Sequence, residues 1–315
     1  MSDIKALHEQ FSVEISAINA LLQSNLPIDI HLLNNVFKHI FNAGGKRLRP
    51  LLTLMISHLI SNESNDSTIA LAAAVELIHT ATLLHDDVID NALIRRGLKT
   101  ANNIWGDKTS ILIGDFMLSK AFQLIIAAGK NKAFKELADA AATISAAEIM
   151  QLQLLSKLDI TLDEYFKLIT DKTAVLFGAA CAIGAIANDC DNEIIESARN
   201  FGINYGIAYQ IKDDLLDYTG DSVKLGKDNF QDIKEGKITL PIILLLQKAE
   251  QSILAEVLLA IKEYNTHKIL QFIKEYNIVE LVHEQINHYL TLAMRSLANY
   301  DRCMTLDCLF SALST

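Results

Sequence analysis

Two acidic segments contain the residues best suited to chemistry, and both have the pattern Asp-Asp-x-x-Asp. They are Asp86, Asp87 and Asp90 in the first segment and Asp213, Asp214 and Asp217 in the second. Residues three or four apart share one face of an α-helix, so the outer aspartates of each segment point the same way. Carboxylates this close repel one another unless a cation neutralises them. Open clusters of carboxylate oxygens suit Mg²⁺, which commonly bridges protein carboxylates to substrate phosphates.

A solvated acidic helix end is the alternative interpretation of one such segment. Both segments, however, have apolar flanks, which are Leu84, Val88 and Ile89 in the first and Ile211, Leu215 and Leu216 in the second. Apolar neighbours favour burial, which a solvated acidic face does not. Two acidic turns in apolar helices therefore indicate two carboxylate sets that face each other across a cavity.

Basic residues accompany the acidic segments at two places. The segment GGKRLRP, residues 44 to 50, has three cations at a break between helices, and Arg95 and Arg96 follow the first acidic segment. Glycines let the chain approach an anion, and arginine binds phosphate bidentately. The first cluster fits a phosphate site, although a lone basic turn is more often plain surface. The two arginines fit either a phosphate held opposite the metal or simple neutralisation of the aspartates.

Helices must position these residues, because the chain is rich in Ala, Leu, Ile, Glu and Lys and strand-type alternation is scarce. The pattern predicts helices over residues 3–24, 28–42, 50–61, 67–90, 109–128, 132–157, 161–188 and 192–219, and further helices from residue 240 onward. No linker or low-complexity run divides the chain. We therefore predict an all-α protein with one domain over residues 1–315. A long polar connection before residue 240 contains Lys227, Asp232 and Lys237, and such connections often act as lids.

Composition limits the partners and the compartment. The net charge of −10 argues against nucleic acid as a partner, because phosphate backbones require a basic surface. The four cysteines lack metal-type spacing, and the first residues show no export signal, so we expect reduced thiols and a cytoplasmic location. The longest apolar run, residues 174 to 187, is too short to span a bilayer, so we expect no transmembrane segment and interpret the run as a core helix.

These motifs together suggest diphosphate chemistry, and the chain resembles the trans-type polyprenyl diphosphate synthases, most closely the octaprenyl branch. The resemblance rests on GGKRLRP, AVELIHTATLLHDDVID, RRG, GDF, KT, YQIKDDLLDY and the lysines and TLP of the polar connection. It implies a helical bundle around a deep cavity, usually paired as a homodimer. It also implies a Mg²⁺-dependent prenyltransferase that adds isopentenyl diphosphate to an allylic prenyl diphosphate. We expect farnesyl diphosphate as the primer and a product that serves as a quinone side chain.

The resemblance also implies residue roles. Mg²⁺ would be held by Asp86, Asp90 and Asp213, with Asp87, Asp214 and Asp217 in support. The allylic diphosphate would contact Arg95, Lys172, Thr173, Gln210 and Lys227. Isopentenyl diphosphate would contact Lys46, Arg49, His79 and Arg96. In the polar connection Asp232 and Lys237 keep the family pattern, whereas Asp228 and Phe230 stand where relatives commonly have proline or asparagine and then glycine.

Product length depends on the residues before Asp86, because the growing chain must extend towards the start of that helix. Short-chain members of the family often have an aromatic ring four or five residues before the first aspartate, where this chain has Thr82 and Ala81. These residues and Ile78, one turn earlier, predict an open path and a long product. We expect the path to end near the break at Gly129.

Three other functions remain as alternatives. A geranylgeranyl or farnesyl synthase would share every motif and differ only in product length. A class I terpene cyclase usually has a different second metal motif and needs no isopentenyl site. A non-catalytic partner subunit tends to lose one acidic motif, whereas this chain has both.

Overall fold

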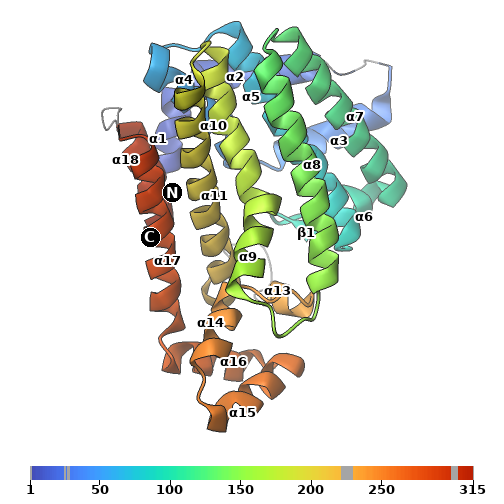
Figure 1. Ribbon diagram of the computed structural model, residues 1–315. Coiled ribbons are helices and arrows are strands. Elements are labelled where there is room, and N and C mark those ends of the chain that lie inside the picture. Colours follow the sequence, from blue (N-terminus) through green and yellow to red (C-terminus); the bar gives the residue numbers. More distant parts are fainter. Residues whose placement is uncertain (1, 25, 27–28, 221–229, 299–303, 315) are drawn as a thin grey trace.

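Helices make up nearly all of the structure, a computed structural model that describes every residue except 1, 25, 27–28, 221–229, 299–303 and 315 (Figure 1). The all-α prediction is confirmed. The N-terminal helices are α1 (Ser2–Gln10), α2 (Ser12–Ser24), α3 (His31–Asn42), α4 (Leu48–Ser61) and α5 (Asp66–Ile89). The middle of the chain forms α6 (Ala101–Trp105), α7 (Asp107–Ala127), α8 (Asn131–Leu154), α9 (Leu162–Ile169), the π-helical turn η1 (Thr170–Ala174), α10 (Val175–Ala187) and α11 (Asn192–Thr219). The remainder forms α13 (Gln231–Lys234), α14 (Leu240–Lys248), α15 (Gln251–Lys262), α16 (Thr266–Glu275), α17 (Ile278–Ser296) and α18 (Met304–Ser314).

Side-chain caps explain why several helix starts could be predicted accurately from the sequence. Asn65 accepts a hydrogen bond from the Thr68 amide, and Asp191 accepts one from the Ile194 amide. Thr161 and Glu164 form a reciprocal capping box at the start of α9. Each cap satisfies amide groups that a helix end otherwise leaves without partners, so the bounds follow from local sequence.

The core lies between α10 and its neighbours α4, α5, α8 and α11 (Figure 1). All residues from Leu176 to Ala187 are buried, as expected for the long apolar run. Glycines on α11 let its backbone approach α10 closely. A Cβ atom on Gly202 would lie 2.3 Å from the Phe177 carbonyl oxygen, and one on Gly206 would lie 2.7 Å from the Ala174 Cα atom. This close approach brings the acidic turn of α11 beside η1.

Several elements depart from the predicted pattern. The N-terminal helix divides at Phe11, and the helix over 161–188 contains the π-helical turn η1. A two-stranded antiparallel hairpin, β1 (Ile94–Arg95) and β2 (Leu98–Lys99), follows the first acidic turn. Contacts with other parts of the fold determine such short elements, so the helical periodicity of the sequence does not predict them.

The polar connection is described only from Phe230 onward, so Lys227 and Asp228 lie outside the described residues. Phe230 is buried and has a left-handed backbone with φ of 62°. Its ring packs edge-to-face on Tyr218, with centroids 5.5 Å apart. A left-handed conformation at a bulky residue is unfavourable, and this burial offsets the cost.

Three helical stretches, Asp66–Ile89, Asp107–Ala127 and Leu162–Ala187, are long and apolar enough to cross a membrane by length and composition. The apolar run at residues 174 to 187 forms the end of the third stretch, Leu162–Ala187. The apolar helical stretch is therefore longer than this run alone suggested. In the first and third stretches, 67% and 72% of the most apolar window is buried inside the protein, against 39% in α7. The absence of a transmembrane segment and the single domain both stay predictions.

We predict that Gly202→Ala destabilises the fold, because its methyl group would overlap the Phe177 carbonyl oxygen. Overpacking against backbone costs about 1–3 kcal/mol or more. Urea unfolding followed by circular dichroism measures the loss. Asn200→Ala, an exposed position on the same helix, is the matched control and should not destabilise. Equal stability of the two variants would contradict the close approach of α10 and α11.

Candidate active site

The first acidic turn ends α5, and its three carboxylates have different surroundings. Asp87 is 4% exposed and accepts a hydrogen bond from Arg95 Nε at 2.7 Å. The hairpin β1–β2 returns Arg95 to the helix and thereby makes this pair. Asp86 and Asp90 are half-buried. Arg95 therefore neutralises Asp87, which was one of the two interpretations of this arginine.

The second acidic turn divides its roles in the same way. Asp213 is exposed, whereas Asp214 accepts hydrogen bonds from the Tyr165 hydroxyl at 2.6 Å and from Gln210 Nε2 at 2.7 Å. Asp217 is fully buried and accepts the backbone amides of Gln231 and Asp232 at the start of α13. Protein donors thus engage the oxygens of Asp87, Asp214 and Asp217. These donors give all three a structural role. Among the described residues, the side chains of Asp86 and Asp213 accept no hydrogen bond from the protein, whereas Asp90 is paired with Lys237.

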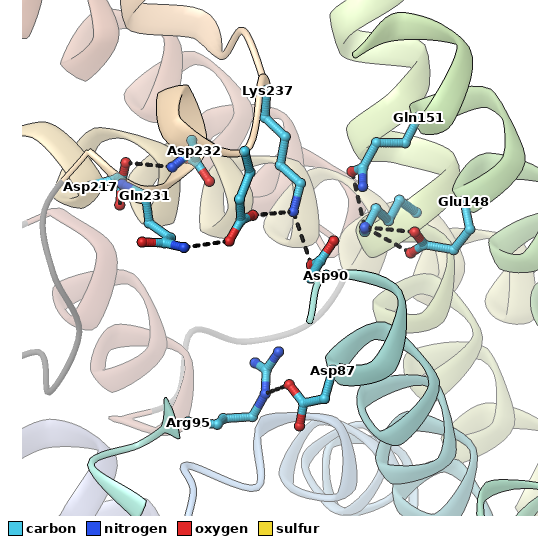
Figure 2. Close-up of polar contacts among 11 residues, drawn as sticks. Asp87, Asp90, Arg95, Glu148, Gln151, Asp217, Gln231, Asp232 and Lys237 are labelled. Carbon is cyan, nitrogen blue, oxygen red and sulfur yellow. Dashed lines mark hydrogen bonds and ion pairs between the residues drawn. The ribbon is translucent and has the colours of Figure 1, made fainter. Parts of the chain in front are cut away.

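Lys237 connects the two turns. Asp217 anchors α13, and the chain then leads to Lys237, whose Nζ atom lies 3.0 Å from Asp90 Oδ2 and 2.7 Å from Glu235 Oε2 (Figure 2). Burial alone would lower the pKa of Lys237, but the charges of Asp90 and Glu235 outweigh it and raise this pKa. Lys237 therefore links the segment that Asp217 anchors to Asp90 on the other acidic turn.

Lys172 and Thr173 lie on the π-helical turn η1, and their partners come from other helices. Lys172 Nζ binds Glu148 at 2.9 Å and Gln151 at 3.0 Å, both on α8 (Figure 2). The Thr173 hydroxyl donates to Gln210 Oε1 at 2.8 Å. π-Turns occur often at functional sites, because the extra residue redirects side chains. The sequence analysis missed Glu148, Gln151 and Glu235, and only a pairing between distant helices would have revealed them.

The carboxyl group of Asp86 has a raised pKa. Burial and the nearby charge of Glu148 raise its pKa to about 7, although Lys172 and Arg95 act in the opposite direction. Burial and a neighbouring carboxylate both disfavour the charged form of a carboxyl group, and a nearby positive charge favours it. This position accordingly favours a bound cation.

The basic side of the site depends on close contact between Arg96 and the glycines. Arg96 Nη1 donates to the Gly44 carbonyl oxygen, and a Cβ atom on Gly45 would lie only 2.5 Å from Arg96 Nη1. Gly45 also has φ of 147°. The glycines therefore make room for a guanidinium group from another segment, in addition to letting the chain approach an anion.

Three further residues complete this side. Arg49 lies over the Phe177 ring at 4.3 Å, and its buried Nε atom makes no hydrogen bond among the described residues. Burial lowers the pKa of Arg49 to about 10, so it remains charged. Burial and the surrounding arginines lower the pKa of His79 well below its usual value, so His79 is a neutral group here. Lys46 is exposed, and its carbonyl oxygen contacts His8 Nε2 at 3.0 Å.

Arg47 and Glu76 form a pair that the residue roles did not include. Arg47 Nη1 lies 3.3 Å from Glu76 Oε1, and the guanidinium stacks over Phe41 at 4.6 Å. Burial raises the pKa of Glu76, whereas Arg47, Arg49 and Arg96 lower it. Glu76 thus provides negative charge among three guanidinium groups that face the same region.

A cavity of about 130 Å³ adjoins this network. Its polar side contains Lys172, Thr173, Gln210, Asp214, Asp232 and Lys237, and its apolar side contains Leu154, Leu155, Ile160, Leu168 and Ile169. The cavity therefore brings together Lys172, Thr173 and Gln210 of the predicted allylic side. Arg95 does not line it and pairs with Asp87 instead, and Lys227 lies outside the described residues. Among the described residues, no three His, Cys, Asp or Glu side chains are grouped to hold one metal ion. A cation at either turn would need oxygens from a substrate or water, as is usual for Mg²⁺.

Known proteins resemble this chain over most of its length. The family model described as "Polyprenyl synthetase" matches residues 30–277. Octaprenyl diphosphate synthase of Escherichia coli (strain K12) is 34% identical, covering 87% of this chain and 84% of that protein. Geranylgeranyl diphosphate synthase of Saccharolobus solfataricus is also 34% identical, covering 91% and 90%. The crystal structure of polyprenyl synthase from Caulobacter crescentus CB15, complexed with calcium and isoprenyl diphosphate, superposes with a TM-score of 0.93 at 33% identity, covering 99% of this chain and 98% of that one.

We predict that divalent-cation binding weakens as the pH falls through about 7, because Asp86 then takes up a proton. Calorimetric titration with Mg²⁺ and inorganic diphosphate between pH 6 and 8 measures this effect. Glu148→Gln removes a charge that raises the pKa of Asp86, so the loss should move to lower pH. A pH profile that is identical in wild type and Glu148→Gln would contradict this assignment.

Proposed function

The chain belongs to the polyprenyl synthetase family, and on this premise we propose that it makes octaprenyl diphosphate from farnesyl and isopentenyl diphosphates. It is a prenyltransferase. The observation that carries the proposal is the pairing of Lys237 with Asp90, because Asp217 anchors the segment that bears Lys237. Both acidic turns consequently face one region, where a diphosphate with bound cations fits between them.

The family uses divalent metal ions, and we propose Mg²⁺ held by Asp86, Asp90 and Asp213. These carboxylates suit it because Mg²⁺ prefers oxygen ligands, and because a cation would stabilise the charged form of Asp86, which burial and the Glu148 charge disfavour. At Asp90 the cation would have to displace or share the contact with Lys237. Mg²⁺ would supply positive charge for the departing diphosphate. Lys172 and Lys237, already at this side of the site, add positive charge near the same leaving group.

Two separate basic regions support two phosphate-bearing substrates. Lys172 and Gln210 would bind the allylic diphosphate, and Arg49 and Arg96 would bind isopentenyl diphosphate. In the proposed reaction the allylic carbon–oxygen bond breaks, and the double bond of isopentenyl diphosphate attacks the resulting carbocation. Loss of a proton to the departing diphosphate then forms the new double bond. Neutral His79 provides a hydrogen-bond donor without additional charge.

The packing of α5 and α7 supports a long product. The Ser67 hydroxyl at the start of α5 donates to the Ala128 carbonyl oxygen at the end of α7, so the two helices run in opposite directions. A hydrocarbon that extends back from Asp86 would approach the α7–α8 break, where the Phe122 and Phe134 rings lie 6.0 Å apart. Ile78 and Ala81 are fully buried, and the half-buried Thr82 donates to the His79 carbonyl oxygen.

We also propose a cytoplasmic homodimer whose product serves as a quinone side chain. Exposed apolar residues on α7 and α8 support pairing, since Leu112, Ile126 and Ile149 are each more than 60% exposed. Apolar surface of this kind commonly marks protein contacts.

The first test of this function is the loss of turnover in Asp86→Ala and Asp213→Ala. Each should reduce diphosphate release from farnesyl and isopentenyl diphosphates by roughly two to three powers of ten, because metal-held charge is a large catalytic contribution. Asp139→Ala, which removes an exposed carboxylate paired with Lys135 on α8, is the control and should retain full rate. Wild-type turnover in either site variant would refute the metal-binding role proposed for that carboxylate.

The Ala81→Phe variant tests the predicted product length. A ring five residues before Asp86 lies about 7.5 Å back along the helix, so products should shorten to about three or four isoprene units. Ala81→Ser adds little volume and should preserve the wild-type length. Chromatography of dephosphorylated products distinguishes these outcomes. An active Ala81→Phe enzyme with unchanged long products would show that Ala81 does not border the path.

A further inference from the structure

Tyr165 contacts the second acidic turn but has no part in the proposed reaction. It lies on α9, is 1% exposed, and its hydroxyl group is 2.6 Å from Asp214 Oδ2. Asp214 is itself only 5% exposed. A short hydrogen bond to a buried carboxylate is among the stronger ones in proteins.

The carboxylate of Asp214 determines the direction of every hydrogen bond around it. A carboxylate only accepts, so Tyr165 must donate its proton and Gln210 must present its Nε2 atom. Gln210 Oε1 is then directed at Thr173, whose hydroxyl must donate to it. Burial and the Asp214 charge raise the pKa of Tyr165 well above its usual value, so Tyr165 keeps the proton that it donates.

The orientation of the Gln210 amide determines which hydrogen-bond donors are available to an anion in the cavity. Thr173 directs its proton at Gln210, whereas the second Nε2 hydrogen of Gln210 has no acceptor in the part of the chain that the structure describes. Gln210 and Thr173 both border the cavity, beside Lys172. An inverted Gln210 amide would present its carbonyl oxygen instead, and an oxygen disfavours a bound diphosphate.

We propose that Tyr165 is a positioning residue, which acts through Asp214 to keep the Gln210 amide turned as a donor for the allylic diphosphate. The proposal rests on the proposed function, because the anion is the allylic substrate. Tyr165 also packs edge-to-face on Phe166, with centroids 5.3 Å apart, so a purely structural role is the competing explanation. The two explanations differ in which substrate they affect.

Steady-state kinetics of Tyr165→Phe distinguishes them, because this change removes one oxygen and keeps the ring. We expect kcat/KM for farnesyl diphosphate to fall about tenfold, the scale of one hydrogen bond to a charged group, while KM for isopentenyl diphosphate stays unchanged. Tyr205→Phe is the matched control, since Tyr205 is buried on α11 and, among the described residues, its hydroxyl makes only a 3.4 Å contact with the Leu309 carbonyl oxygen. It should retain wild-type kinetics for both substrates.

A double-mutant cycle with Gln210→Met tests the route of the effect. Gln210→Met alone should reproduce the selective loss, and adding Tyr165→Phe to it should change little more. Full additivity, an equal loss for both substrates, or wild-type kinetics in Tyr165→Phe would overturn the proposal. If Tyr165→Phe does not fold, an unselective loss in Gln210→Met overturns it. Failure of the wild-type enzyme and of Tyr205→Phe to condense the two substrates would instead refute the proposed function.

Discussion

Repulsion between neighbouring carboxylates is the constraint on which this site depends. Six aspartates lie in two helical turns, and protein donors engage Asp87, Asp90, Asp214 and Asp217. Arg95 comes from a hairpin, Tyr165 from α9, and the amides at Asp217 from α13. Each engaged carboxylate thus holds a different segment in place, while the side chains of Asp86 and Asp213 accept no protein donor among the described residues. The acidic turns organise the surrounding structure as well as the chemistry.

Local spacing predicted much of this arrangement. Periodicity and capping residues placed the long helices, and the repeated Asp-Asp-x-x-Asp pattern predicted two turns that border one site. Spacing did not reveal that Asp214 and Asp217 are engaged by the protein, because their partners lie elsewhere in the chain. The π-helical turn at Lys172 was missed for the same reason, since tertiary packing selects it. Residues of the connection before Phe230, including Lys227, lie outside the description.

The basic side shows how a motif can serve a purpose that its composition does not indicate. The glycines of GGKRLRP accommodate Arg96, which comes from the hairpin. Glu76 lies among Arg47, Arg49 and Arg96, so the cations do not repel one another without compensation. One hairpin therefore supplies Arg95 to the acidic turn and Arg96 to the basic segment. Two adjacent residues consequently link the acidic side of the site to its basic side.

The left-handed backbone at Phe230 has a consequence for how the segment at α13 can move. A glycine at such a position bends without penalty, so displacement is gradual. Phe230 instead couples its backbone to a buried ring on Tyr218, and its amide donates to the Asp217 carbonyl oxygen. Displacement would expose an aromatic side chain, at a cost of about 2 kcal/mol, while relieving an unfavourable φ angle. The free energy of displacing α13 would therefore depend on temperature, because the hydration of the exposed ring does.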